Sequence, residues 1–207
     1  MKKNCANCIY GNIHSQEIVL EDKAILFLEG QSLKHVYSIN QGYIKMSKYT
    51  ENGDEYIIGV LGPGDYIALL ALLQNKETYI ASATALSKVE LRSMEKNEVL
   101  KAYQSNQKFK EMCLNCAITR SNLFHNQLSI SANTDIKEKI ILILSNLANK
   151  FGYINNKKMY IDLPFSKTVL ANIINVRRET LSRYLSVLQN EKILSVNKNQ
   201  YILHYVI

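Results

Sequence analysis

The chain has 207 residues, of which 47% are hydrophobic and 21% are charged, so it is long enough to bury one large core or two modest ones. Its formal net charge of +7 and isoelectric point of about 9.1 favour an anionic partner. No apolar run approaches the roughly 20 residues of a membrane span, and no apolar signal segment follows the first lysines, so we expect a cytoplasmic protein without a membrane partner.

The basic excess lies towards the C-terminal end. Residues 1–132 carry 14 Lys and Arg against 13 Asp and Glu, whereas residues 133–207 carry 11 against 5. The anionic partner is therefore expected to bind the last third of the chain.

Short runs rich in Ile, Val and Tyr alternate with glycine turns between residues 18 and 91. The turns recur every 10 to 12 residues and contain Gly30, Gly42, Gly53 and Gly62-Pro63-Gly64-Asp65. This spacing predicts antiparallel strands in a sandwich or barrel. The expected strands are 24–28, 36–40, 43–49 and 55–61, with further strands in 79–91.

The pattern changes to a helical period between Glu98 and about Ser131. Side chains recur there at alternating spacings of three and four, which is typical of the heptad seam of a dimerising helix. The expected seam is Phe109, Met112, Cys116, Thr119, Leu123, Asn126 and Ile130, and a second stripe is Leu114, Ala117, Ser121, Phe124 and Leu128. We expect one stripe to contact a partner subunit and the other the β-domain. The alternative is a core helix within one subunit.

A third pattern follows a hinge at residues 131–134. Asn133 or Thr134 is the expected N-cap of a helix over 135–149, and a strand over 159–163 comes next. Two helices joined at Asn175 follow, the first of them capped by Ser166, and a β-hairpin of 193–196 and 201–205 ends the chain. This order predicts a winged helix.

The stretch from Asn175 to Gln189 is the expected DNA-recognition helix. Its polar residues come first, and the N-terminal turn of a recognition helix is the part that reaches base edges in the major groove. Arg178 and Arg183 offer donors that match guanine, and Glu179 between them can accept a hydrogen bond from cytosine. The alternative is a helical hairpin whose charges are only solvated.

A glycine-punctuated β-roll, a long helix and a winged helix in this order resemble the CRP/FNR family of bacterial transcription regulators. The specific matches are Gly30, Gly42, Gly53, Gly62-Pro63-Gly64-Asp65-Tyr66 and Arg178-Glu179-Thr180-Leu181-Ser182-Arg183. The resemblance implies an α+β fold with a cyclic-nucleotide-binding-like jelly roll. The expected domains are a Cys-x-x-Cys arm over 1–17, a β-roll sensor over 18–97, a dimerisation helix region over 98–131 and a winged helix-turn-helix over 132–207.

The resemblance implies that the bases are contacted by Arg178, Glu179, Ser182 and Arg183. Palindromic DNA with TGTGA-like or TTGAT-like half-sites is expected, the former favoured because Arg178 is present. Phosphate contacts are assigned to Lys167, Thr168 and Arg177. Double-stranded DNA and a second copy of the chain are the expected partners, with RNA polymerase as a further candidate.

The expected effector is not cyclic AMP. In the cyclic-nucleotide branch of the family, a glutamate binds the ribose and an Arg-Ser pair binds the phosphate. This chain has Leu69 at the first position and Glu77-Thr78 at the second. A carboxylate at the phosphate position would repel the ligand.

Four cysteines form two Cys-x-x-Cys pairs, Cys5 with Cys8 and Cys113 with Cys116. Four thiolates suit a zinc ion or an iron-sulfur cluster, and a switchable disulfide is another reading. The oxygen-sensing branch carries a further cluster cysteine near position 90, which this chain lacks. The alternative is that Cys116 packs in the dimer seam, Cys113 is a small helix residue and the first pair is inert.

We therefore expect a non-enzymatic, homodimeric, sequence-specific DNA-binding regulator that is controlled through the β-roll or the cysteines. An enzyme with a cupin-like metal site would need clustered His and Glu ligands, and no His-x-His pair exists. A redox or zinc-binding adaptor without base-specific DNA binding remains the alternative, and salt-sensitive binding without sequence preference would mark it.

Overall fold

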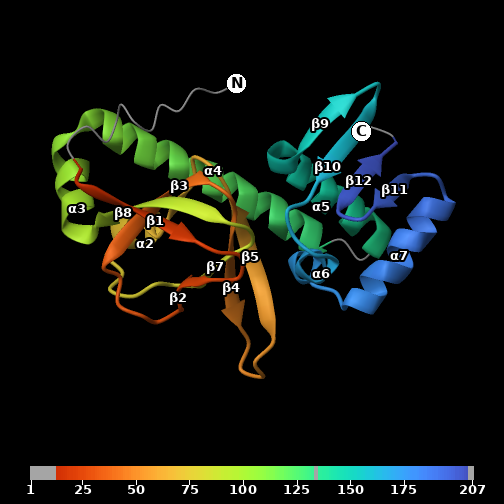
Figure 1. Ribbon diagram of the computed structural model, residues 1–207, viewed down its shortest axis with the longest axis horizontal. Coiled ribbons are helices and arrows are strands. Elements are labelled where there is room, and N and C mark those ends of the chain that lie inside the picture. The colour runs from red at the N-terminus through yellow and green to blue at the C-terminus, as the bar shows by residue number, and fades with distance from the viewer. Residues whose placement is uncertain (1–12, 133–134, 205–207) are drawn as a thin grey trace. The chain divides into compact units, whose positions relative to one another are not determined.

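The computed structural model describes residues 13–132 and 135–204. They fall into two compact units. The first contains the residues up to Asn52 and Ile58–Asn122, and the second contains Gly53–Ile57 and the residues from Leu123 onward, so helix α4 belongs in part to each (Figure 1). Over the described ranges, no helix has the length and apolar character needed to span a membrane.

Two four-stranded sheets make up the first unit, with strand orders β1-β8-β3-β6 and β2-β7-β4-β5 (Figure 1). Neighbouring strands run antiparallel, as where His35 of β3 lies opposite Glu95 of β8. The strands are β1 (Ser15–Leu20), β2 (Ile25–Phe27), β3 (His35–Gln41), β4 (Ile44–Tyr49), β5 (Glu55–Leu61), β6 (Tyr66–Ile67), β7 (Ser82–Ala85) and β8 (Val89–Glu95). The predicted antiparallel β-roll is confirmed, although β1 starts before the predicted boundary at residue 18.

Glycine turns determine how these strands connect. Gly42 has a φ of 82°, and a Cβ built on it would lie 2.2 Å from the Lys88 carbonyl oxygen, so only glycine fits between β3 and β4. The turn before β6 is closed from both sides, because the backbone N–H of Asp65 donates to the Gly62 carbonyl at 2.9 Å and its Oδ2 accepts from the Gly62 N–H at 2.9 Å.

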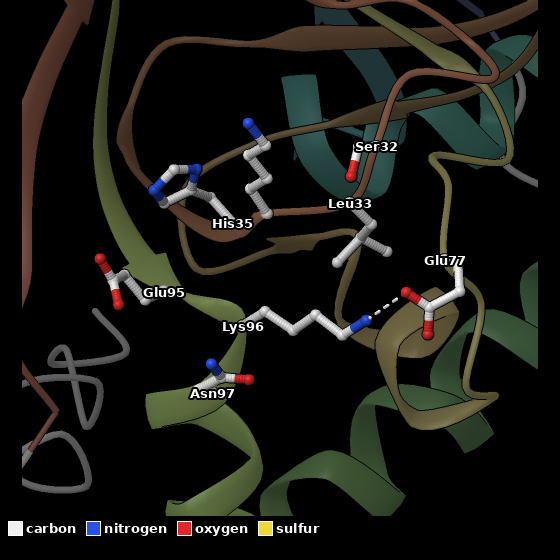
Figure 2. A pocket seen from close by; sticks show the side chains of 8 residues that line it. Ser32, Leu33, His35, Glu77, Glu95, Lys96 and Asn97 are labelled. Atoms are coloured by element: carbon white, nitrogen blue, oxygen red, sulfur yellow. Dashed lines mark hydrogen bonds and ion pairs between the residues drawn. The ribbon is translucent and has the colours of Figure 1, made fainter.

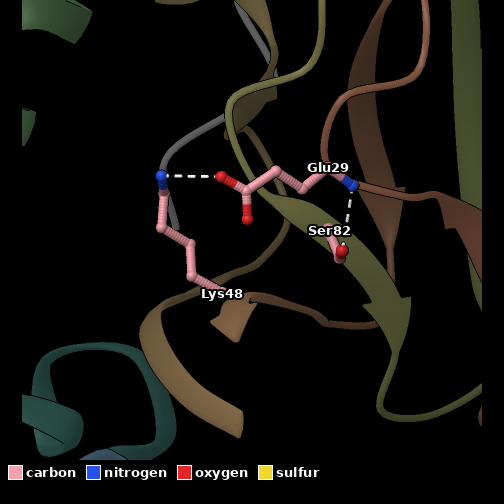
Figure 3. Close-up of polar contacts among 3 residues, drawn as sticks. All are labelled: Glu29, Lys48 and Ser82. Carbon is pink, nitrogen blue, oxygen red and sulfur yellow. Dashed lines mark hydrogen bonds and ion pairs between the residues drawn. The ribbon is translucent and has the colours of Figure 1, made fainter. Parts of the chain in front are cut away.

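The loop after β2 is tied to the second sheet through Glu29. Its backbone N–H donates to Ser82 Oγ on β7 at 3.0 Å, and its carboxylate accepts from Lys48 Nζ on β4 at 2.8 Å (Figure 3). An aromatic stack lies nearby in the core, with the rings of Phe27 and Tyr79 3.6 Å apart between centroids.

The first unit also contains α2 (Leu69–Leu73), α3 (Lys96–Ser105) and the first part of α4 (Gln107–Ala132). The single helical region predicted over 98–131 is divided at Asn106. This residue has extended dihedrals, and its Oδ1 accepts from the Phe109 N–H at 3.1 Å, so it caps α4. The break arises because an asparagine side chain competes well for the free N–H groups at a helix start.

The structure shows which of the two stripes of α4 meets the chain's own β-roll. Phe109 and Cys113 belong to the core of the β-roll, and Met112 and Cys116 pack against it. The stripe predicted as the dimer seam is therefore the one that contacts the chain's own β-roll, at least in its first half. The neighbouring face leaves Leu114, Ile118 and Phe124 exposed by 61%, 50% and 61%. The side chains of Leu123 and of residues 126–132 lie outside the described ones.

The second unit contains a four-stranded sheet of order β11-β12-β10-β9 and three further helices. Its elements are α5 (Ile136–Phe151), β9 (Gly152–Asn155), β10 (Lys158–Asp162), α6 (Lys167–Ile174), α7 (Arg178–Asn190), β11 (Leu194–Asn197) and β12 (Gln200–Leu203). Fully buried residues from all three helices and from the sheet form its core, among them Ile140, Leu144, Leu170, Leu181, Ile161 and Tyr201.

Two details of this unit differ from the sequence prediction. The N-cap of α5 is Asp135, whose carboxylate accepts from the Lys137 N–H at 2.7 Å, so the predicted cap at Asn133 or Thr134 is wrong, and these two residues lie outside the described ones. Strand β9 was not predicted. Its turn to β10 uses Asn156 and Lys157 in the left-handed region, with no glycine to signal it.

Candidate nucleic-acid interface

Helices α6 and α7 form a helix-turn-helix whose turn is set by Asn175. This residue has φ 61° and ψ 51°, the left-handed conformation that asparagine tolerates. The Val176 N–H then donates to the Ala171 carbonyl at 3.0 Å, which closes the C-terminus of α6. At the other end, Ser166 Oγ accepts from the Val169 N–H at 3.5 Å. Both the predicted N-cap and the predicted turn residue are confirmed.

Packing leaves the polar face of α7 available. Leu181, Leu185 and Leu188 are buried and hold the helix on the domain core. Arg178, Glu179 and Arg183 are exposed on the other side, and Ser182 is half-buried between them. The structure thus brings the four predicted base-reading residues together on one face, in the first turns of α7.

The arginines of this face have no acidic partner among the residues that the structure describes. Neither Arg178 nor Arg183 forms an ion pair within residues 135–204, and the Arg183 guanidinium lies 5.3 Å from the ring centre of Tyr184. A cation over an aromatic face keeps its charge, and the contact is weak at an exposed site. Both guanidinium groups can therefore bind an anion without breaking a salt bridge.

The predicted phosphate ligands lie at helix N-termini. Lys167 and Thr168 are the first residues of α6, and Arg177 is the N-cap of α7. Arg177 makes no side-chain cap, so the first N–H groups of α7 point outward without a side-chain acceptor. Helix N-termini attract phosphate through these N–H groups and the helix dipole.

Sequence reasoning missed further exposed lysines in this unit. Lys198 lies in the turn of the β11–β12 wing with a φ of 53°, and Lys157 and Lys158 lie at the β9–β10 turn. The lysine inside the expected wing turn was the available signal, because a basic hairpin tip is suited to phosphate contact.

Two positions of the β-roll, 69 and 77, correspond to the residues that bind ribose and phosphate in the cyclic-nucleotide branch of the resemblance. Leu69 starts α2 and is 1% exposed, so it offers no acceptor to a ribose hydroxyl. Glu77 points to the surface, where Lys96 Nζ donates to its carboxylate at 2.8 Å (Figure 2). The first position therefore carries an apolar side chain and the second a carboxylate.

A shallow surface pocket of about 370 Å³ surrounds this ion pair (Figure 2). It is lined by Ser32, Leu33, Lys34, His35, Glu77, Glu95, Lys96 and Asn97. Its lining includes two lysines and two glutamates, so the pocket has no strong preference for ligands of one charge.

The second cysteine pair lies on the inward face of α4. Burial, reinforced by the neighbouring Cys116, raises the pKa of the Cys113 thiol to about 12. Burial also raises the pKa of Cys116, with an opposing effect from Arg120 and a further rise from Asp65. Cys5 and Cys8 lie outside the described residues, and within residues 13–132 and 135–204 no three His, Cys, Asp or Glu side chains gather as a metal site.

A β-roll joined by a long helix to a winged helix with exposed arginines on its recognition helix defines a DNA-binding regulator with a sensor-type domain. Comparison with known families agrees: residues 17–106 match the cyclic nucleotide-binding domain, and residues 138–205 match the Crp-like helix-turn-helix domain. The chain belongs to the CRP/FNR family of transcription regulators.

Similar proteins extend over nearly the whole chain. The global nitrogen regulator of a Nostoc species is 26% identical over 185 residues, which cover 89% of this chain and 83% of that protein. The fumarate and nitrate reduction regulatory protein of Yersinia pestis is 26% identical, covering 92% and 75% of the two chains. The structure of FixK2 from Bradyrhizobium japonicum, at 17% identity and a TM-score of 0.80, covers 92% of this chain and 93% of its own and shows the same fold.

Proposed function

We propose that this DNA-binding transcription regulator acts as a homodimer that reads a palindromic site with TGTGA-like half-sites, under the control of a signal other than cyclic AMP. The observation that carries the proposal is the first turns of α7, where Arg178, Glu179 and Arg183 are exposed above a buried apolar face. A cytoplasmic location, where the DNA lies, goes with this function.

Base reading follows from the donors and acceptors of this face. A guanidinium can bind both O6 and N7 of guanine, and a carboxylate can accept from cytosine N4. A TGTGA half-site and its complement offer both base types. Ser182 adds a hydroxyl to the same face, while Lys167, Thr168 and Arg177 position the helix on the phosphates.

Dimerisation is supported by the exposed face of α4. Leu114, Ile118 and Phe124 are large apolar side chains on one side of one helix, and single subunits seldom leave such a stripe uncovered. Leu114 and Phe124, together with Ala117 and Ser121 between them, follow heptad spacing, the pattern for packing against a second helix. We infer that α4 of a second copy covers this face. A two-fold dimer would then place two α7 helices in successive major grooves about 34 Å apart.

The signal is assigned to the β-roll or to the cysteines. A zinc or iron-sulfur site would combine Cys5 and Cys8 with Cys113 and Cys116, and it would require Cys113 to leave the core in which it is 2% exposed. Metal analysis of protein purified without air tests this arrangement directly.

Selection of binding sites from random duplexes tests the proposed function. The expected result is enrichment of an inverted repeat of TGTGA-like half-sites, with both halves required. Enrichment of a single half-site would contradict the dimer. Binding that is salt-sensitive but without any enriched sequence would refute base readout and favour the adaptor alternative.

A further inference from the structure

Helix α4 holds the short strand β6 at two points through one residue, Tyr66. The buried Tyr66 side chain donates its hydroxyl to Met112 Sδ at 3.1 Å. Eight residues further along α4, Arg120 Nη2 donates to the Tyr66 carbonyl oxygen at 3.0 Å. The side chain and the backbone of the same residue are therefore both bonded to α4.

The Tyr66 carbonyl receives the Arg120 bond from outside its own sheet. Strand β6 lies at the edge of the order β1-β8-β3-β6 and is paired with β3 alone, through Tyr37 opposite Ile67 and Ser38 opposite Tyr66. An edge strand has one side of its backbone without a neighbouring strand. A hydrogen bond from a charged donor is stronger than one between neutral groups, so the bond from Arg120 stabilises this position of β6.

The segment around β6 depends on such tertiary contacts. Ala68, directly after β6, has a left-handed φ of 67°, which is unfavourable for alanine, and α2 begins without a side-chain cap. Ile67, Leu69 and Leu72 are at most 1% exposed, so packing in the core holds the segment, and the Arg120 bond adds a polar contact from α4.

Arg120 lies where α4 leaves the first unit. The inward face of the helix runs through Phe109, Cys113, Cys116 and Arg120, so the arginine is the polar end of a stripe that is otherwise packed on the core. The first unit ends two residues later, at Asn122, and α4 continues into the second unit. Both Arg120 and Asp65 of the turn before β6 affect the pKa of Cys116, which agrees with their convergence at this point.

We propose that Arg120 is the positioning residue that couples the segment 62–73 to α4, so that a displacement of β6 changes how α4 packs and thereby the DNA affinity of α7. This inference rests on the proposed DNA-binding function. Coupling of two sites is reciprocal, so DNA binding at α7 must in turn alter the stability of segment 62–73, and the alteration must pass through Arg120.

Hydrogen exchange of the full chain tests the coupling without knowledge of the natural signal. Amide exchange in peptides covering 62–73 is compared with and without a duplex that carries two TGTGA-like half-sites. In the wild-type protein the duplex should change the exchange rate by about five-fold or more, the lower range of coupling between sites. In Arg120→Ala the change should fall to less than about two-fold although the duplex is still bound.

Lys108→Ala is the matched control, because it removes the same charge from an exposed position of the same helix and should keep the wild-type response. If Arg120→Ala does not fold, Arg120→Gln carries the same test. A wild-type response in the Arg120 variant, or no response in a wild-type protein that binds the duplex, would overturn the inference alone. Failure of the wild-type protein to bind any selected duplex would overturn the proposed function as well.

Discussion

Truncation of Leu114 tests whether a second copy covers the outer face of α4. Burying a leucine side chain fully stabilises by about 2 kcal/mol relative to leaving it exposed. Since Leu114 is 61% exposed in the single subunit, covering it contributes about 1.2 kcal/mol per subunit. A two-fold dimer buries two copies, so Leu114→Ala should weaken dimerisation by about 2.4 kcal/mol, or roughly 60-fold in the dissociation constant.

Sedimentation equilibrium over a range of protein concentrations measures this constant. Asn115→Ala is the control, because Asn115 is an exposed neighbour outside the apolar stripe and its loss should change dimerisation little. At protein concentrations that give the same fraction of dimer, the Leu114 variant should unfold at a temperature close to that of the wild type. An unchanged dissociation constant, or an equal loss in the Asn115 variant, would refute the assignment of this face.

Three further predictions concern the β-roll and α4. Gly42→Ala should destabilise the first unit by more than about 2 kcal/mol in thermal unfolding, because a left-handed backbone and a close carbonyl both exclude a Cβ, whereas Gly59→Ala, with open space and an ordinary φ, should be nearly neutral. Equal effects of the two would contradict this account of the turn. Ser47 Oγ is buried and lacks a hydrogen-bond partner among the residues described, so Ser47→Ala should leave stability unchanged or raise it by up to about 1 kcal/mol, and a clear loss in denaturant unfolding would reveal a hidden partner. The Cys113 pKa of about 12 in the folded state lies above its ordinary value of 9.0, so the folded state holds this proton more tightly. The contribution of this thiol to the free energy of unfolding should therefore be complete below about pH 9 and should be lost as the pH rises from about 9 to 12. In Cys113→Ala, the free energy of unfolding measured across that range should fall less than in the wild type.

Several features could be predicted from the sequence alone, because they depend on local chemistry. Ser166 and Asn175 could be placed because an N-cap and a left-handed turn each demand particular side chains, and the β-roll turns could be placed because glycine is needed there. The gathering of Arg178, Glu179 and Arg183 on one face of α7 likewise follows from helical spacing.

Other features depend on contacts that no spacing pattern reveals. Both stripes of α4 alternate three and four residues, so the pattern predicts two apolar faces but not which of them meets the chain's own β-roll; the burial of Phe109 decides it. The break at Asn106 arises from one amide cap, and strand β9 is reached through a left-handed Lys157, which sequence does not signal. The link between Arg120 and Tyr66 joins residues 54 positions apart and is visible only in the fold.

The central claim, base reading by α7, is tested most directly through Arg183. Fluorescence anisotropy at fixed salt gives the affinity of wild-type, Arg183→Ala and Lys167→Ala protein for the selected palindrome and for a random duplex of equal length. Arg183→Ala should lose about 1–3 kcal/mol on the palindrome and much less on random DNA, because a lost base contact affects only the specific site. Lys167→Ala should weaken both duplexes about equally. Equal losses on the two duplexes for Arg183→Ala would contradict base readout by this helix.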